Sequence, residues 1–224
     1  IRLELFPPDW GVTYGMIDTL EKSPRLVIDL TAILYFACIG KLEWLTPHKP
    51  KLMVCQSTLD QLKEVAAEWA RAKDGLKSLV SDGTIVAFHD VSPEVVGEWR
   101  HTVDDALRFI EGLPRQNIVG RSTEPVLGQL EIEAIGQVTV DVLNTVFERN
   151  CPCLLADYRL TRLVSRTDFI SVAALHVTAV EAKKYSMGEH TEMMADLMRK
   201  GVQYVAVSPE MLEEGMRRFI KKND

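Results

Sequence analysis

The stretch LVIDLTAILYFACIG, residues 26–40, joins a short apolar run to a helical pattern through one carboxylate. A strand buried on both faces of a parallel sheet has this wholly apolar character, and the residues after Asp29 have helical spacing. The stretch CLLAD, residues 153–157, follows the same plan and ends on Asp157. A buried carboxylate is costly unless an arginine, a helix N-terminus or a cation compensates it. Both acids are therefore candidates for a functional site.

Further short apolar runs predict the other strands of a sheet. They are KLMVC at 51–55, TIVAFHDV at 84–91, DFISV at 168–172 and VQYVAV at 202–207. Helical patterns separate most of these runs, and alternation of this kind indicates a parallel sheet covered by helices on both faces. We expect an α/β fold with three layers, α/β/α, around a central, mainly parallel sheet. Ligands of such folds bind outside the carboxyl ends of the strands.

Capping residues and turns predict the helix boundaries. Ser57 is expected to cap a helix that continues through about Leu79. Ser92 is expected to cap the next helix, with Pro93 at its first position. A further helix is expected over about 128–148, and the irregular segment 114–126 is expected to be an exposed loop.

Composition limits the classes of protein that fit. The chain has 224 residues, 46% hydrophobic and 26% charged, and no apolar run of about 18 residues that would span a membrane. Its net charge of −6 argues weakly against generic nucleic-acid binding. The four cysteines include CPC at 151–153, which lacks the spacing of a zinc site, and nothing requires an oxidising compartment. We therefore expect an intracellular, cytoplasmic protein, and the start IRLELF suggests a piece of a longer one.

Two segments offer more acids near helix starts. Asp60 lies at the start of the helix predicted from Ser57, and Glu131 and Glu133 lie near the start of the helix predicted over 128–148. Taken singly, each acid is explained by its favourable interaction with a helix dipole. Together with two aspartates at strand ends they could hold a divalent cation, because Mg²⁺ prefers oxygen ligands.

The motifs of several other activities are missing from the sequence. No G-x-G-x-x-G or P-loop opens a helix, and no HExxH or Ser-His-Asp arrangement is present. A receiver-like signalling domain would need two acids at the end of the first strand and a lysine after a late strand. Neither is found around Asp29 or Val207, so this alternative has low weight.

The order of these segments resembles the PIN-domain nucleases, and more narrowly bacterial PIN domains fused to other modules such as helical repeats. The motifs are the strand, Asp and helix at 26–40, S-x-L-x-x-L at 57–62, G-x-x-E-x-E-A-I at 128–135 and A-D-x-R at 156–159. The resemblance covers about residues 25–207. It implies a PIN-like domain over 25–224 with an insertion at about 81–126, preceded by an N-terminal arm or linker at 1–24.

The resemblance also implies the site residues. Asp29 matches the first family acid, Glu131 the third, and Asp157 the acid after the later strand. In the family these acids hold Mg²⁺ or Mn²⁺ and hydrolyse phosphodiesters, usually of RNA. Gln61 occupies the position of the second acid, with Asp60 directly before it. Asp60 is accordingly a fourth candidate catalytic acid.

Substrate-binding residues are implied in the same way. Thr31 matches the small hydroxyl residue two positions after the first acid, and Gln61 lies beside the expected site. Arg159 and Arg162 follow Asp157 and could contact backbone phosphates. An ordinary ion pair or an exposed helix face is the alternative for both arginines.

Two functions follow from the resemblance. The first is a metal-dependent endoribonuclease. The resemblance implies that it could be the effector part of a defence or toxin-like system, with upstream domains in a longer parent protein and a homodimer as its assembly. The second is a PIN-fold module that has lost catalysis and serves as a binding or scaffolding unit. Gln61 and Tyr158, which stand where the family often has acids, favour the second.

Overall fold

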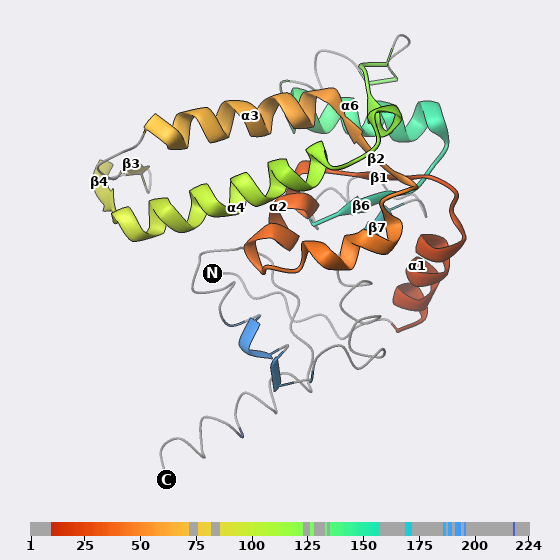
Figure 1. Cartoon of the computed structure of the whole chain (residues 1–224), viewed down its shortest axis with the longest axis horizontal. Coiled ribbons are helices and arrows are strands. Elements are labelled where there is room, and N and C mark those ends of the chain that lie inside the picture. The colour runs from red at the N-terminus through yellow and green to blue at the C-terminus, as the bar shows by residue number, and fades with distance from the viewer. Residues whose placement is uncertain are drawn as a thin grey trace.

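The computed structural model has three layers (Figure 1). It describes residues 10–71, 76–81, 86–122, 126–127, 133, 135–156, 169–171, 186, 188–189, 191–193, 195 and 217. The helices are α1 (Trp10–Lys22), α2 (Leu30–Cys38), η1 (Leu42–His48), α3 (Gln56–Arg71), α4 (Pro93–Glu111), η2 (Arg115–Asn117) and α6 (Gln137–Arg149). The strands are β1 (Leu26–Ile28), β2 (Leu52–Cys55), β3 (Leu76–Ser81), β4 (Val86–Val91), β5 (Ile118–Val119), β6 (Cys153–Leu155) and β7 (Phe169–Ser171).

The central sheet is parallel throughout its described strands, which have the order β5-β2-β1-β6-β7. Val27 of β1 pairs with Met53 of β2 on one side and with Cys153 of β6 on the other. The strands are short and apolar because both faces of the sheet are covered. The predicted α/β/α architecture is confirmed, and so are β1, β2, β6 and β7 at the predicted places.

Alternate residues of each strand enter two separate cores. Leu26 and Ile28 of β1 point into a core that contains side chains of α2 and α4, whereas Val27 between them points into a core with α6. Successive side chains of a strand face opposite sides of the sheet, so one short strand serves both layers. The sheet is thereby fixed between α2 and α4 on one face and α6 on the other (Figure 1).

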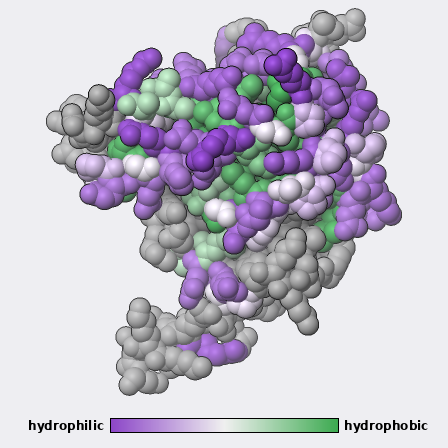
Figure 2. All heavy atoms as spheres, in the orientation of Figure 1, coloured by the Kyte–Doolittle hydropathy of each residue, from purple (hydrophilic) through white to green (hydrophobic). Residues whose placement is uncertain are grey.

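A helical pair with a hairpin at its tip projects beyond the sheet. α3 leaves the end of β2 and α4 returns beside it, with β3 and β4 at the far end (Figure 1). β3 and β4 form an antiparallel two-stranded sheet apart from the central one. Arg100 of α4 donates to the Trp69 carbonyl in the last turns of α3 at 2.7 Å, which ties the two helices together. On the face of the molecule seen in Figure 2, hydrophilic residues cover much of the surface, with an apolar band in the middle.

The helix predicted from Ser57 begins earlier and ends sooner than expected. α3 begins at Gln56, directly after β2, so Ser57 lies inside the helix and is not its N-cap. α3 ends at Arg71, and Leu76–Ser81 forms β3 where helix was predicted through Leu79. Six residue pairs with β4 outweigh the helical propensity of this segment. The predicted cap at Ser92 and the position of Pro93 at the start of α4 are confirmed.

The segment predicted as an exposed loop contributes to the sheet. Arg115–Asn117 forms η2, and Ile118 and Val119 form β5 beside β2. Asn117 is buried, and its amide donates to the Lys49 carbonyl at 3.0 Å. The loop prediction for 114–126 is therefore wrong over these residues, because two residues of strand are too few to give a periodic pattern.

The helix predicted over 128–148 is interrupted by a glycine. Gly136 has φ +85°, a conformation that L side chains rarely adopt, and α6 begins only at Gln137. Residues 133 and 135 are helical before the interruption. Within the described residues, no helix is long and apolar enough to cross a membrane. The division of the chain into an arm, a domain and an insertion stays a prediction.

Candidate metal site at the carboxyl edge of the sheet

Asp29 lies between the end of β1 and the start of α2, and it is 6% exposed. Its backbone is extended, and its carboxylate Oδ1 accepts the N–H of Ala32 at 2.8 Å, so it is the N-cap of α2. Its own N–H donates to the Leu154 carbonyl of β6 at 3.2 Å. An N-cap carboxylate is stabilised by the N–H groups and the dipole of the helix. The cost of burying this charge is therefore partly met by the fold itself.

Thr31 joins Asp29 to the end of β6. Its hydroxyl donates to Oδ2 of Asp29 at 2.6 Å. The hydroxyl oxygen of Thr31 also accepts the N–H of Ala156 at 3.3 Å. Ala156 directly precedes Asp157 in the chain. The hydroxyl of Thr31 thus brings the residue before Asp157 to the carboxylate of Asp29.

Several predicted site residues lie outside the described residues. They are Glu131, Asp157, Tyr158, Arg159 and Arg162. Their roles stay predictions.

Asp60 and Gln61 lie on α3, which starts at the carboxyl end of β2. Asp60 is exposed, and its carboxylate accepts the side-chain amide of Gln56 at 2.8 Å. α3 has no acid in its first turn, so Asp60 lies one turn further along than predicted. Gln61 is half-buried. The structure places both on the helix that leaves this edge of the sheet.

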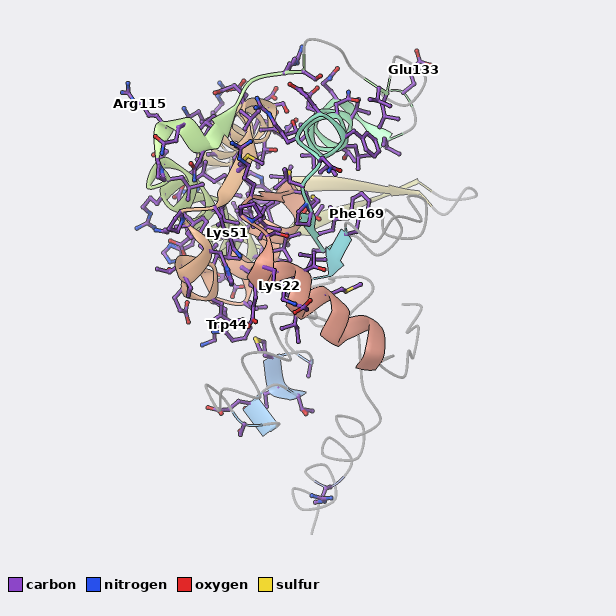
Figure 3. All side chains as sticks on the ribbon, turned by 90° about the vertical axis from the view of Figure 1, so that its right-hand side faces the viewer. Lys22, Trp44, Lys51, Arg115, Glu133 and Phe169 are labelled. Atoms are coloured by element: carbon purple, nitrogen blue, oxygen red, sulfur yellow. The ribbon has the colours of Figure 1, made fainter. Side chains whose placement is uncertain are left out.

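Glu133 is exposed and lies at the outer margin of the molecule, away from Phe169 of β7 (Figure 3). Among the described residues, no three His, Cys, Asp or Glu side chains gather in a way that could hold a metal ion. The metal site around Asp29 therefore stays a prediction, and its further ligands would have to come from residues outside the described ones.

Asp141 is a second buried acid that reading the sequence missed. It lies in the second turn of α6 and is 5% exposed. One carboxylate oxygen accepts the side-chain amide of Gln137 at 2.6 Å, and the other lies 3.3 Å from Nε of Arg121. Among the described residues, Asp29 and Asp141 are the only buried acids. The signal for Asp141 in the sequence is weak: an acid between Val140 and the apolar pair Val142 and Leu143.

Two buried cysteines, Cys55 of β2 and Cys153 of β6, point from the sheet into the core that it shares with α6. Burial raises the pKa of Cys55 to about 11, against a weaker lowering by its hydrogen bond with Thr145, and the charge of Asp141 adds to the rise. Burial also raises the pKa of Cys153, with the charge of Asp29 as the next cause. All four cysteines are free. Protonated, buried thiols are unsuited to bind metal or to react.

The oxygen atoms of Asp29 are of the kind that hard divalent cations prefer as ligands. Asp29 provides a buried carboxylate, and Mg²⁺ and Mn²⁺ take oxygen ligands of this kind. One carboxylate is too few, and Ala156 beside Thr31 marks the point from which Asp157 follows. The set fits such an ion provided that the chain after Ala156 supplies a second carboxylate.

An all-parallel sheet between helical layers, with a buried aspartate capping the helix after its central strand, defines a class of α/β domain whose ligands bind at the carboxyl edge. The family model described as "PIN domain associated with the TPR-GreAB-C-PIN system" matches residues 27–166. The match covers more than half of the chain and includes Asp29, so the chain belongs to this PIN-domain family and the predicted resemblance is confirmed. No curated protein and no solved structure matches the chain.

Proposed function

We propose that this PIN domain is a metal-dependent endoribonuclease that hydrolyses RNA phosphodiesters at the carboxyl edge of its central sheet. The observation that carries the proposal is the Asp29 carboxylate, which is buried and held at each oxygen by a hydrogen bond, from Ala32 and from Thr31. A buried carboxylate oriented by two hydrogen bonds at a strand end is suited to bind a hard cation. Membership in a nuclease-type family supports the same function.

Asp29 would hold Mg²⁺ or Mn²⁺ together with Asp157 and Glu131, directly or through water. Asp60 or Gln61 would occupy the position of the second family acid. When bound, the ion would supply a water of lowered pKa and stabilise negative charge that develops on the phosphate. Thr31 would keep the Asp29 carboxylate in its orientation during the reaction, since its hydroxyl is bonded to Oδ2.

Arg159 and Arg162 would bind backbone phosphates of the RNA near this edge. Their guanidinium groups match phosphate oxygens in pairs. Because the whole chain carries a net charge of −6, local cations of this kind would be needed to attract RNA.

A catalytically inactive scaffolding module is the second candidate. Gln61 stands at the position of the second acid, and an amide oxygen brings no charge to a cation site. Tyr158 follows Asp157 where the family often has another acid. Such a module would keep the fold and the capping role of Asp29 without binding metal tightly.

The family's description supports a place in a larger protein with TPR and GreAB-C parts, in which this domain would be the effector, as in a defence or toxin-like system. Four free cysteines suit the reducing conditions of a cytoplasm. We include a homodimer as the expected assembly of the domain.

The test is the cleavage of end-labelled single-stranded RNA with Mn²⁺ or Mg²⁺. We expect cleavage by the unmodified chain and a loss of at least about 100-fold in Asp29→Asn and Asp157→Asn, because removing a ligand charge weakens the ion's binding. Asn can still cap α2, so Asp29→Asn should remain folded. Asp18→Asn, which removes an exposed acid from α1, is the matched control and should cleave normally.

Thermal unfolding with Mn²⁺ separates the two candidates. A ligand that binds only the folded protein raises the free energy of unfolding by about 2.7 kcal/mol at 100 times its dissociation constant. A midpoint that rises with millimolar Mn²⁺ in the unmodified chain, and not in Asp29→Asn, supports the nuclease. An unchanged midpoint together with no cleavage under either metal would leave the scaffolding module.

A further inference from the structure

Arg121 lies at the same edge of the sheet as Asp29. β5 is parallel to β2, with Val119 opposite Cys55, and Arg121 follows β5 after one glycine. The carboxyl ends of parallel strands meet at one edge, so Arg121 lies where β1 ends in Asp29. Two strand spacings separate β5 from β1, which is about 10 Å along that edge.

A buried carboxylate holds the guanidinium of Arg121 on one side. Nε of Arg121 lies 3.3 Å from Oδ2 of Asp141, and the arginine side chain is 68% exposed whereas that of Asp141 is 7% exposed. The contact is an ion pair without the geometry of a hydrogen bond. Gln137 donates to the other oxygen of Asp141, which fixes the carboxylate. Most of the Arg121 side chain is open to solvent, so its guanidinium can also contact a ligand.

The described chain before and after Arg121 is held at two places. Before it, β5 pairs with β2. After it, Asn144 of α6, which is buried, accepts the Leu127 N–H with its Oδ1 at 2.8 Å and donates to the Leu127 carbonyl with its Nδ2 at 3.3 Å. The ion pair with Asp141 adds a restraint on the Arg121 side chain itself before any ligand binds.

Stability alone does not account for this arrangement. An ion pair with a largely exposed arginine contributes little to the free energy of unfolding. An arginine whose orientation is set in advance, in contrast, binds a ligand at a lower cost in conformational entropy. The planar guanidinium is the side chain best matched to phosphate oxygens.

We infer that Arg121 binds a backbone phosphate of the RNA that flanks the cleaved bond, and that Asp141 is the residue that positions it. The inference deepens the proposed function and rests on RNA being the substrate. Because β5 lies two strand spacings, about 10 Å, from β1, Arg121 suits a phosphate next to the one bound at Asp29. Arg121 thus sets the path of the RNA strand across the ends of β1, β2 and β5.

The test is RNA binding without cleavage. Single-stranded RNA labelled with a fluorophore is titrated in EDTA over a range of salt concentrations, with the unmodified chain, Arg121→Gln, Arg121→Lys and Asp141→Asn. Arg115→Gln is the matched control, because it removes the same charge from the opposite, amino-terminal edge of the sheet. Arg115 is exposed and precedes β5 (Figure 3). Thermal midpoints confirm that each variant is folded.

We expect Arg121→Gln to weaken binding about fivefold and to lower the slope of log K against log salt by about 0.7, the value for one phosphate contact on a single strand. Arg121→Lys should keep the slope and lose part of the affinity. Asp141→Asn makes the chain less negative, so charge alone predicts tighter binding, whereas loss of positioning predicts weaker binding. Arg115→Gln should leave the slope unchanged.

Equal effects of Arg121→Gln and Arg115→Gln, or tighter binding by Asp141→Asn, would overturn the inference. So would an unmodified chain that does not bind RNA. If the unmodified chain binds RNA through Arg121 but cleaves none with Mn²⁺, the proposed nuclease activity fails and the phosphate contact stands. If it cleaves RNA while Arg121→Gln binds as tightly as before, the contact fails and the activity stands.

Discussion

Thr31 donates its hydroxyl hydrogen to Oδ2 of Asp29 at 2.6 Å and accepts the N–H of Ala156 at 3.3 Å with the same oxygen. One side chain thus connects the ends of β1 and β6, which are neighbours in the sheet but far apart in the chain. A hydroxyl can do this because it is donor and acceptor at once. The orientation of the Asp29 carboxylate and the position of the chain before Asp157 consequently depend on the same residue.

Thr31→Val keeps the shape of the side chain and removes both hydrogen bonds. Since partners of metal ligands commonly account for a factor of 10 or more in metal affinity, we expect Mn²⁺ binding to weaken about tenfold, as measured by calorimetry, with a parallel fall in RNA cleavage. Thr31→Ser keeps the hydroxyl and should retain most of both. Equal Mn²⁺ affinities of the Val and Ser variants would show that the hydroxyl does not position Asp29.

Cys55 makes stability fall at alkaline pH. Because burial raises the pKa of Cys55 to about 11 from its ordinary 9.0, the folded protein keeps its thiol protonated while the unfolded chain loses the proton. The unfolded state is therefore favoured as pH rises from about 9 to about 11, by at most roughly 2–3 kcal/mol. Urea unfolding at pH 8 and pH 10 measures the change.

Cys55→Ser is the reference for that measurement. A serine hydroxyl next to Thr145 does not ionise in this range, so other titrating groups cancel when the two proteins are compared. We expect a smaller loss of stability in the serine variant between the two pH values. The same loss in both proteins would assign the pH dependence to other groups.

Lys51 fixes the end of α1 to the domain. Its ammonium group donates to the carbonyls of Leu20 and Glu21, which belong to the last turn of α1. Lys51→Met keeps most of the stem and leaves those carbonyls without the cation, so we expect a loss of about 1 kcal/mol in the free energy of unfolding. Urea unfolding, with hydrogen exchange of the α1 amides, measures it.

Lys22→Met is the matched control for Lys51→Met. Lys22 lies 2.6 Å from Asp18 on the exposed side of α1, and both side chains are well exposed. Figure 3 labels the two lysines near the same helix. An exposed pair of this kind contributes almost nothing, so the control should unfold like the unmodified chain. A comparable loss in both variants would contradict the capping role of Lys51.

Gly136 is required by its backbone and not by crowding. Its φ of +85° and ψ of 152° lie in a region that is essentially limited to glycine, while a Cβ added there would have nothing within 4 Å. Gly136→Ala should therefore lower the free energy of unfolding by about 1–3 kcal/mol. Gly97→Ala, in open space within helix α4, should raise it by about 0.5–1 kcal/mol. Losses of equal size in both would exclude backbone strain as the cause.

The order of strands and helices was predictable where the local pattern agreed with the final packing. The runs at 26–28, 52–55 and 153–155 are apolar throughout because they are covered on both faces, and this is visible without the structure. Asp29 was also predictable, since a charge at the end of such a run needs a partner. For β3, helical propensity misled because pairing with β4 decides its conformation.

The acids show the same division. Asp29 follows a strand whose pattern predicts the edge where it lies, whereas Asp141 resembles an ordinary polar position in a helix. Its ion pair with Arg121 joins α6 to the residue that follows β5 and its glycine. No local pattern in the sequence predicts a contact between segments that meet only when the chain is folded.

The sequence by itself determined the three-layer fold, its parallel strands, its PIN-like order of motifs and the capping aspartate at the end of β1, because each depends on hydrophobic periodicity and on local hydrogen bonds. Only the tertiary structure decided the two-residue strand β5, the hairpin at the tip of α3 and α4, the link from Thr31 to Ala156 and the pairing of Arg121 with Asp141. These features depend on contacts between distant segments, whose free energy exists only once the sheet and its helices have come together.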